Sequence, residues 1–202
     1  MKKILLLAMI LFFTPLFTHA QDEYSKIEFA GMFNLLRADI DILGNETMYG
    51  YGAGAQYNAS KHLGMVAEWS AAHGSSGPVT IFQEGTTYEL PLVDTRVQTL
   101  LFGPRLSYRP ALRLPGRAVS VTLFGHCLMG AGTNKIDYNV SSYTKWQFAF
   151  ALGGGMDVNV GGRFAIRVAQ FDWLPIRSRL ELEGAGGFFN NWRYQAGGVI
   201  KF

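Results

Sequence analysis

The sequence predicts an all-β protein, an eight-stranded antiparallel up-and-down transmembrane β-barrel. Three observations lead to this prediction. Side chains alternate in polarity along successive segments, the connections between these segments alternate in length, and small and aromatic residues are abundant. Of 202 residues, 24 are glycine, 14% are aromatic and only 16% are charged. This composition suits strands in which small and large side chains alternate around a closed wall.

The carboxy-terminal segment shows the alternation most clearly. From residue 192 to 202 the chain reads WRYQAGGVIKF, which places Trp192, Tyr194 and Phe202 on one face and Arg193 and Lys201 on the other. Such a period of two predicts a strand with one apolar and one polar face. The same pattern predicts seven further strands, at 26–36, 48–57, 63–71, 96–108, 119–131, 146–158 and from 164 onward.

The seventh strand interrupts its own alternation. Gln170 and Asp172 fall on the apolar side if the period of two continues without a break. A β-bulge near Ala169 would return both polar side chains to the interior and turn Phe171 and Trp173 outward. We therefore expect a bulge at this position.

The connections between the predicted strands are alternately short and long. The tight ones span 58–62 and 159–163, and the long ones span 37–47, 72–95, 132–145 and 174–191. The middle turn, 109–118, is longer than this alternation predicts. Outer-membrane barrels have short periplasmic turns and long outer loops. Within the second loop, residues 80–90 predict a hairpin around Glu84 and Gly85, and residues 179–192 could form another. These loops offer Phe82, Tyr88, Phe188 and Phe189 as candidate contacts for an unknown partner.

Alternation alone does not decide which face is inside, because a soluble ligand-binding barrel has the same period in the opposite sense. Small residues crowd the polar face, as a narrow packed lumen requires: Gly50, Gly52, Gly54, Gly153, Gly155 and Gly197. Aromatic residues lie near strand ends on the apolar face, at Tyr49, Tyr57, Trp69, Tyr108, Trp146, Trp173 and Trp192. They resemble the aromatic girdles at the two membrane interfaces. We predict that the apolar face contacts lipid.

The amino-terminal segment predicts export. Lys2 and Lys3 precede an apolar run from Ile4 to Phe17, which indicates a signal peptide at residues 1–20 and a barrel domain at 21–202. Without the two lysines of that segment, 18 basic residues become 16 against 15 acidic ones. Because the mature chain is nearly neutral and has no basic helix, we expect no nucleic-acid partner.

Five stretches carry a family resemblance: 100–109, 124–132, 150–158, 163–175 and the terminal AGGVIKF. They resemble the outer membrane protein beta-barrel domain family, small eight-stranded barrels of the outer-membrane protein A and opacity-protein type. The resemblance implies a location in the cell outer membrane, in contact with its lipid and lipopolysaccharide. It also implies that Phe202 acts as the insertion signal read by the barrel-assembly machinery. The peptidoglycan-binding domain of larger members is not implied.

The predicted interior face carries a set of polar residues that we interpret as a structural network filling the lumen: Glu28, Glu68, Arg105, His126, Asp157, Arg167, Arg193 and Lys201. Eight strands leave an interior just wide enough for side chains to fill. Asp157 and Arg167 flank a tight turn and are expected to pair, and Glu28 and Lys201 are expected at the same end of neighbouring strands. The alternative is a narrow, gated channel lined by these charges.

Catalysis and metal binding have weaker support in the sequence. His126 could serve as the base of an outer-leaflet lipid hydrolase, but Leu128 stands where such a deacylase would have its serine, and no acidic partner is evident. Cys127 is expected to face lipid. We therefore expect no enzyme activity and no cofactor.

The first loop has a weak likeness to a calcium loop through Asp39, Asp41, Gly44, Asn45 and Glu46. Leu43 replaces an oxygen ligand, so a solvated acidic loop without metal is preferred.

The function that follows is a small outer-membrane barrel with a plugged polar lumen and four surface loops, in a structural or surface-interaction role. Three alternatives remain open at this point: a narrow porin-like channel, an outer-leaflet lipid-modifying enzyme and a soluble lipocalin-like binding barrel.

Overall fold

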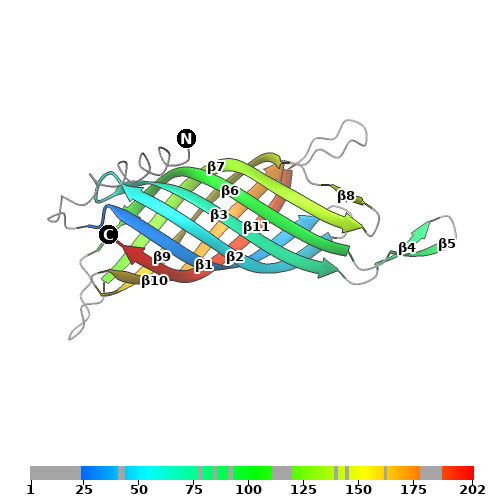
Figure 1. Cartoon of the computed structure of the whole chain (residues 1–202), viewed down its shortest axis with the longest axis horizontal. Helices are drawn as coiled ribbons and strands as arrows, with labels where there is room; N and C mark the ends of the chain where they lie inside the picture. Colours follow the sequence, from blue (N-terminus) through cyan, green and yellow to red (C-terminus); the bar gives the residue numbers. More distant parts are fainter. Residues whose placement is uncertain are drawn as a thin grey trace, which may run out of the picture.

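The computed structural model describes residues 24–40, 44–76, 79–83, 86–90, 93–110, 120–138, 141–143, 146–161, 163–177 and 188–202. Eight long strands form its wall (Figure 1): β1 (Ile27–Ile40), β2 (Gly44–Asn58), β3 (Leu63–Ser76), β6 (Val93–Tyr108), β7 (Ser120–Tyr138), β9 (Trp146–Gly161), β10 (Phe164–Arg177) and β11 (Phe188–Lys201). The predicted signal peptide, residues 1–20, lies outside the described residues. In the part of the chain that is described, no helix is long and apolar enough to cross a membrane.

The eight strands close into a barrel in which every neighbouring pair is antiparallel. Strand order around the wall is β6-β3-β2-β1-β11-β10-β9-β7, and β7 pairs back with β6. The first and last strands, β1 and β11, also pair, so the sheet has no free long edge. Closure satisfies the backbone hydrogen bonds that lipid cannot satisfy. The predicted fold class, an eight-stranded antiparallel barrel, is confirmed.

The two ends of the barrel differ in their connections. The first strand begins and the last strand ends at the same end of the barrel, where the backbone of Ile27 and that of Phe202 exchange two hydrogen bonds. We call this the inner end. At the opposite, outer end, the connection between β3 and β6 carries a separate two-stranded sheet of β4 (Val79–Gln83) and β5 (Thr86–Leu90), and the short β8 (Ser141–Tyr143) adds to β7 (Figure 1). The hairpin predicted in the second loop is confirmed.

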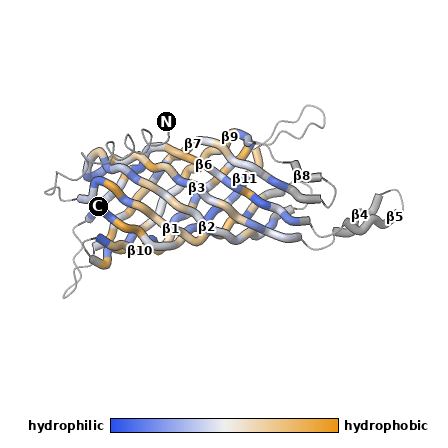
Figure 2. The backbone as a smooth tube through the Cα atoms, in the orientation of Figure 1, coloured by the Kyte–Doolittle hydropathy of each residue, from blue (hydrophilic) through white to orange (hydrophobic). Residues whose placement is uncertain are grey.

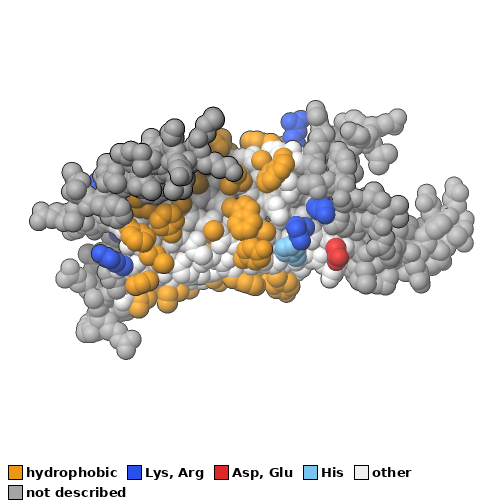
Figure 3. Space-filling view, viewed as in Figure 1, with side chains coloured by type: hydrophobic (Ala, Val, Ile, Leu, Met, Phe, Trp, Pro, Cys, Tyr) orange, Lys and Arg blue, Asp and Glu red, His pale blue; other side chains and the backbone are white. Residues whose placement is uncertain are grey.

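The apolar face of the wall points outward, as predicted. Phe33, Tyr51, Leu106 and Phe171 are among many large hydrophobic side chains that are about half exposed or more on the outer surface. Hydrophobic residues alternate with hydrophilic ones along the strands (Figure 2), and hydrophobic side chains are spread over the middle of the visible surface (Figure 3). Aromatic neighbours on adjacent strands pack together, as do Phe171 and Tyr194, with ring centroids 4.9 Å apart. A soluble binding barrel with a polar exterior is therefore not the arrangement adopted.

The predicted bulge is present in β10. Its register with β11 shifts between Arg167 and Gln170, and its register with β9 shifts between Arg167 and Ala169. Beyond the shift, Gln170 and Asp172 are buried at 0% and 1% exposure, whereas Phe171 is 62% exposed. The extra residue thus returns both polar side chains to the lumen.

The outer connections are shorter than the sequence predicted, because the strands continue past the last clear alternation. β1 and β2 remain paired up to Ile40 and Gly44, so the predicted first loop, 37–47, is largely strand. Asp39 and Asn45 of the supposed calcium loop are ladder partners. Phe188 also belongs to the wall, where its ring packs edge-on against Phe150 at 6.2 Å. The hairpin considered at 179–192 falls mostly outside the described residues, as do the side chains of Phe82 and Tyr88.

Candidate functional site in the barrel lumen

The lumen concentrates the buried charges of the protein. Among the described residues, four acidic and four basic side chains are buried at 9% exposure or less: Glu28, Glu68, Asp157, Asp172, Arg105, Arg167, Arg193 and Lys201. His126 is buried beside them. The structure thus places all eight residues of the predicted interior set inside the barrel, together with Asp172, which the predicted bulge also turns inward. Equal numbers of acids and bases allow the interior to be electrically balanced, which buried charges require.

Arg193 on β11 is the centre of this network. Its guanidinium lies 2.5 Å from Oε1 of Glu68 on β3 and 2.6 Å from Oδ2 of Asp172 on β10. It also donates a hydrogen bond of 3.0 Å to Ser70 Oγ. Because β2 and β1 separate β3 from β11 around the wall, the Glu68 contact crosses the lumen. The central cluster therefore ties opposite walls together.

His126 on β7 joins the same cluster through Asp172. Its Nε2 lies 2.7 Å from Asp172 Oδ1, and both side chains are fully buried. Arg105, a donor only, lies 3.5 Å from His126 Nδ1, which favours the tautomer that carries its proton on Nε2. The expectation that His126 lacks an acidic partner is therefore wrong. The pairing was hidden because Gly153 of β9 lies between the two strands, opposite both residues.

A second cluster lies toward the inner end. Arg167 donates to both carboxylate oxygens of Asp157, at 2.8 and 3.1 Å, as a bidentate pair across neighbouring strands. The guanidinium carbons of Arg105 and Arg167 lie 4.2 and 4.6 Å from the ring centroid of Phe124. The aromatic ring thus contacts two cations that would otherwise repel each other.

Gln170 connects the two clusters. It accepts a hydrogen bond of 3.0 Å from Arg167, and its amide nitrogen lies 3.1 Å from Glu68 Oε2 and 2.7 Å from Gln195 Oε1. Sequence reasoning placed Gln170 inside the barrel but gave it no role. Its position in the network depends on the bulge.

At the inner mouth, Glu28 and Lys201 face each other in the register of β1 and β11 but bind other groups. Glu28 accepts a hydrogen bond from Asn58 at 3.0 Å and forms an ion pair with Arg109 at 3.4 Å. Lys201 donates to Asn159 Oδ1. Arg109 was assigned to a turn, so its return to the barrel mouth was not visible in the alternation.

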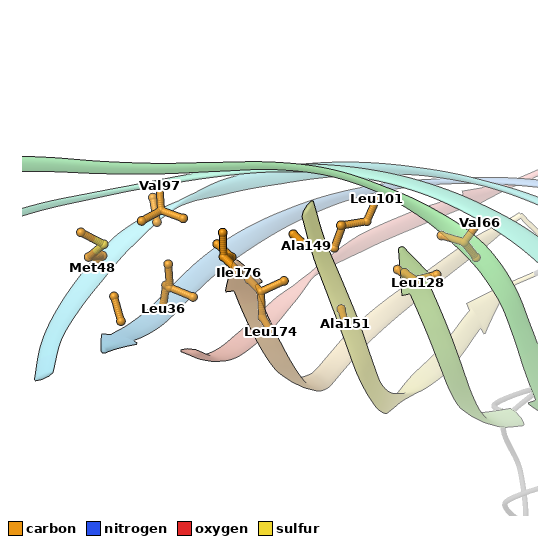
Figure 4. Close-up of a cluster of buried hydrophobic side chains, with 12 residues drawn as sticks. Leu36, Met48, Val66, Val97, Leu101, Leu128, Ala149, Ala151, Leu174 and Ile176 are labelled. Atoms are coloured by element: carbon orange, nitrogen blue, oxygen red, sulfur yellow. The ribbon is translucent and has the colours of Figure 1, made fainter. Parts of the chain in front are cut away.

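An apolar layer fills the lumen on the outer side of the charged clusters. It consists of Leu36, Ala38, Met48, Ala72, Val97, Leu101, Leu128, Ala149, Ala151, Leu174 and Ile176, and Val66 continues it inward past Glu68 to the cavity beside Arg105. Leu36 pairs with Arg193 in the ladder, and Leu174 follows Asp172 by two residues toward the outer end, so the layer adjoins the central cluster. Figure 4 shows these side chains converging from several strands. The predicted lumen was polar, so this apolar layer departs from the prediction.

Glycines create the space that the central cluster occupies. A Cβ atom added at Gly153 would lie 2.1 Å from Asp172 Oδ1 and 2.2 Å from the Phe171 carbonyl oxygen. At Gly155 it would lie 2.6 Å from the ring of Phe124. All three distances are far below van der Waals contact, so these two positions require glycine. The glycine-rich polar face predicted from the sequence has this packing role in β9.

The remaining free space beside the clusters is small. A cavity of about 10 Å³ lies next to Glu68, Gln56 and Arg105, which is room for about one water molecule. Nε of Arg105, which has no hydrogen-bond partner among the described residues, would be satisfied by such a water. Within the described residues, no group of three or more His, Cys, Asp or Glu side chains is arranged to hold a metal ion. The charged side chains of this site therefore pair with one another, and the cavity beside them has room for water but not for a larger ligand.

Comparisons with known proteins agree with this architecture. The model of the outer membrane protein beta-barrel domain matches residues 4–172. Neisserial surface protein A is similar in structure, with a TM-score of 0.61 at 13% identity over 90% of this chain and 100% of that one. The attachment invasion locus protein Ail of Yersinia pestis gives a TM-score of 0.51 at 16% identity over 89% of this chain and 99% of that one. No curated protein matches the chain in sequence. The extent of the family match shows that this chain belongs to the outer membrane protein beta-barrel domain family.

Proposed function

We propose that this outer-membrane barrel has a structural and surface-interaction role, in which the wall anchors the protein and the outer loops make the contacts. The observation that carries the proposal is the filled lumen. A balanced network of buried charges occupies its inner part, and an apolar layer occupies the part toward the outer end. A wall closed in this way leaves the outer connections as the surface available to other molecules.

Among the described residues, the hairpin β4–β5 is an outer connection that forms a sheet of its own. Ail has the same architecture at low identity, and its name, attachment invasion locus protein, describes a role at the cell surface. That likeness assigns no partner to this chain. Our proposal rests on the closed lumen and on the hairpin.

A loop-replacement experiment tests the proposal. Bacteria that display the full barrel are compared in a cell-binding assay with bacteria whose residues 79–90 are replaced by a short glycine-containing turn. We expect the replacement to reduce binding while the heat-dependent gel shift of the barrel is retained. Equal binding after replacement of each outer connection in turn would contradict the proposal.

The channel alternative makes the opposite prediction. Conduction would require the apolar layer around Leu101 and Leu128 to move, since both side chains are fully buried in the lumen. We expect planar-bilayer recordings of the pure protein to show no discrete conductance steps. Regular steps at low voltage would favour the porin-like alternative instead.

The lipid-modifying alternative has one feature in its favour, the His126–Asp172 pair. Aspartate-oriented histidines act as general bases where substrate reaches them. Here both side chains are enclosed, Leu128 is buried beside them, and Cys127 points out of the barrel. We expect a His126→Ala variant to leave the mass spectrum of lipid A unchanged. A change in its acylation that follows the presence of His126 would reopen this alternative.

A further inference from the structure

Three basic residues form a row across neighbouring strands on the outer surface of the wall, apart from the lumen. His73 on β3 pairs in register with Arg96 on β6, and Arg96 pairs with Lys135 on β7. Directly opposed residues on adjacent strands share one face of the sheet. His73 and Arg96 are exposed and Lys135 is half-buried. Figure 3 shows basic side chains and a histidine gathered between the apolar belt and the outer end.

The row lies at the height of the lipid headgroups. On β6 the outward residues run from Phe102 and Leu100, which are exposed on the apolar face, through Gln98 to Arg96. Four residues at about 3.3 Å each, on a strand tilted by about 40°, raise Arg96 by about 10 Å above Leu100. The polar headgroup layer is about 5–8 Å thick on each side of a bilayer. Flexible basic side chains on this row reach that layer.

The geometry of the row suits an anion with several acceptor oxygens. Nε of Arg96 donates a hydrogen bond of 3.1 Å to Nδ1 of His73. A neutral His73 then carries its remaining proton on Nε2, so this nitrogen is a donor, like the terminal nitrogens of Arg96 and the ammonium of Lys135. Contact with His73 also restrains the arginine side chain. Phosphate groups accept several charge-assisted hydrogen bonds of this kind.

We propose that His73, Arg96 and Lys135 bind the phosphorylated headgroup of an outer-leaflet glycolipid. A lipid is favoured over a soluble anion by the position of Asp94. It is exposed on the same face of β6, two residues beyond Arg96 toward the outer end. An anion that approached from the outer solution would pass this carboxylate, whereas a headgroup held in the membrane reaches the row from the side of Leu100. This inference goes beyond the proposed function, because the site lies on the wall and not in the loops.

Lipid titration of the full barrel tests the proposal. The purified protein in detergent micelles is titrated with diphosphorylated lipid A, and bound lipid is measured by native mass spectrometry. We expect the double variant Arg96→Gln/Lys135→Gln to bind roughly tenfold more weakly or worse, because it loses two charge-assisted contacts. The Asp94→Asn variant should bind more tightly. The heat-dependent gel shift verifies that each variant is folded.

The control is Arg177→Gln, which removes one positive charge from an exposed position at the outer end of β10. It is compared with the single variants Arg96→Gln and Lys135→Gln, each of which also removes one. It should bind lipid A as the parent protein does. Lipid A without phosphates should bind weakly to every form, and millimolar inorganic phosphate should not displace lipid A from the parent protein. The proposal is overturned if the double variant binds lipid A with parental affinity, or if Arg177→Gln loses as much affinity as the double variant. It is also overturned if lipid A without phosphates binds as tightly as diphosphorylated lipid A. Displacement by inorganic phosphate would identify a site for soluble anions instead.

Discussion

Removing Arg193 is the most direct perturbation of the lumen. Its side chain is 1% exposed and makes ion pairs with Glu68 and Asp172 at 2.5 and 2.6 Å. Substitution by glutamine changes the balance of buried charges from four acids and four bases to four acids and three bases. Two carboxylates would then share one region of the lumen without the cation between them. The resulting cost is mainly the burial of an uncompensated charge.

The magnitude follows from the degree of burial. Breaking a buried ion pair by removing one partner costs about 3–5 kcal/mol, and glutamine recovers part of this through one hydrogen bond of about 1 kcal/mol. We expect Arg193→Gln to lower the free energy of unfolding by about 3 kcal/mol. In the double variant Glu68→Gln/Arg193→Gln the interior is balanced again. The double variant should therefore be more stable, by about 1–3 kcal/mol, than the sum of the two single losses predicts.

Equilibrium urea unfolding in phosphatidylcholine vesicles, followed by tryptophan fluorescence, measures these differences. If the dependence of the unfolding free energy on urea concentration is unchanged, a lower urea concentration at the midpoint means a lower stability. The exposed Arg177→Gln variant is the control for charge removal and should stay within about 0.5 kcal/mol of the parent. The reasoning is refuted if Arg193→Gln costs less than about 1 kcal/mol, or if the double variant loses the sum of the two single losses.

Two further substitutions test packing and insertion. Gly153→Ala should prevent or strongly impair folding, because its Cβ would overlap Asp172 Oδ1 at 2.1 Å, whereas Gly198→Ala, with nothing within 4 Å, should fold normally. The heat-dependent gel shift compares the two, and equal shifts would contradict the packing argument. Phe202→Ala should slow insertion by the barrel-assembly machinery in reconstituted vesicles. If Phe202 served only to pack against Phe29, their ring centroids being 6.0 Å apart, a Phe29→Ala variant would slow insertion equally.

The sequence predicted the wall well because alternation is a local property. Each strand reveals its own faces, and a break in the alternation is equally local, so the bulge in β10 could be placed from Gln170 and Asp172 alone. Strand ends were predicted less well. At the outer end, Asp39 and Asn45 have the composition of a loop, yet they continue the ladder because β1 and β2 are held in register by the residues before them.

The lumen was predicted only in part, because its contacts are not local. The identity of the inward residues follows from alternation, but their partners depend on which strands face each other across the barrel. Asp172 and His126 are 46 residues apart in sequence, and Glu68 reaches Arg193 across the lumen. The apolar layer was missed for a different reason. Leu36 and Leu174 look like lipid-facing residues by type, although alternation along their own strands places them on the inward face with Asn34 and Asp172.

These cross-lumen contacts bear on why a membrane barrel keeps charges inside at all. Replacing a buried ion pair by apolar side chains is often neutral or stabilising, so stability alone does not explain the network. Register does offer an explanation. A slip of β11 by one residue would turn Arg193 and Gln195 into lipid and bring Trp192 and Tyr194 into the lumen. The slip would also leave Glu68 and Asp172 without their shared cation. Because β11 closes the barrel against β1, a residue that tolerates only one register at this strand selects the correct closure of the whole wall.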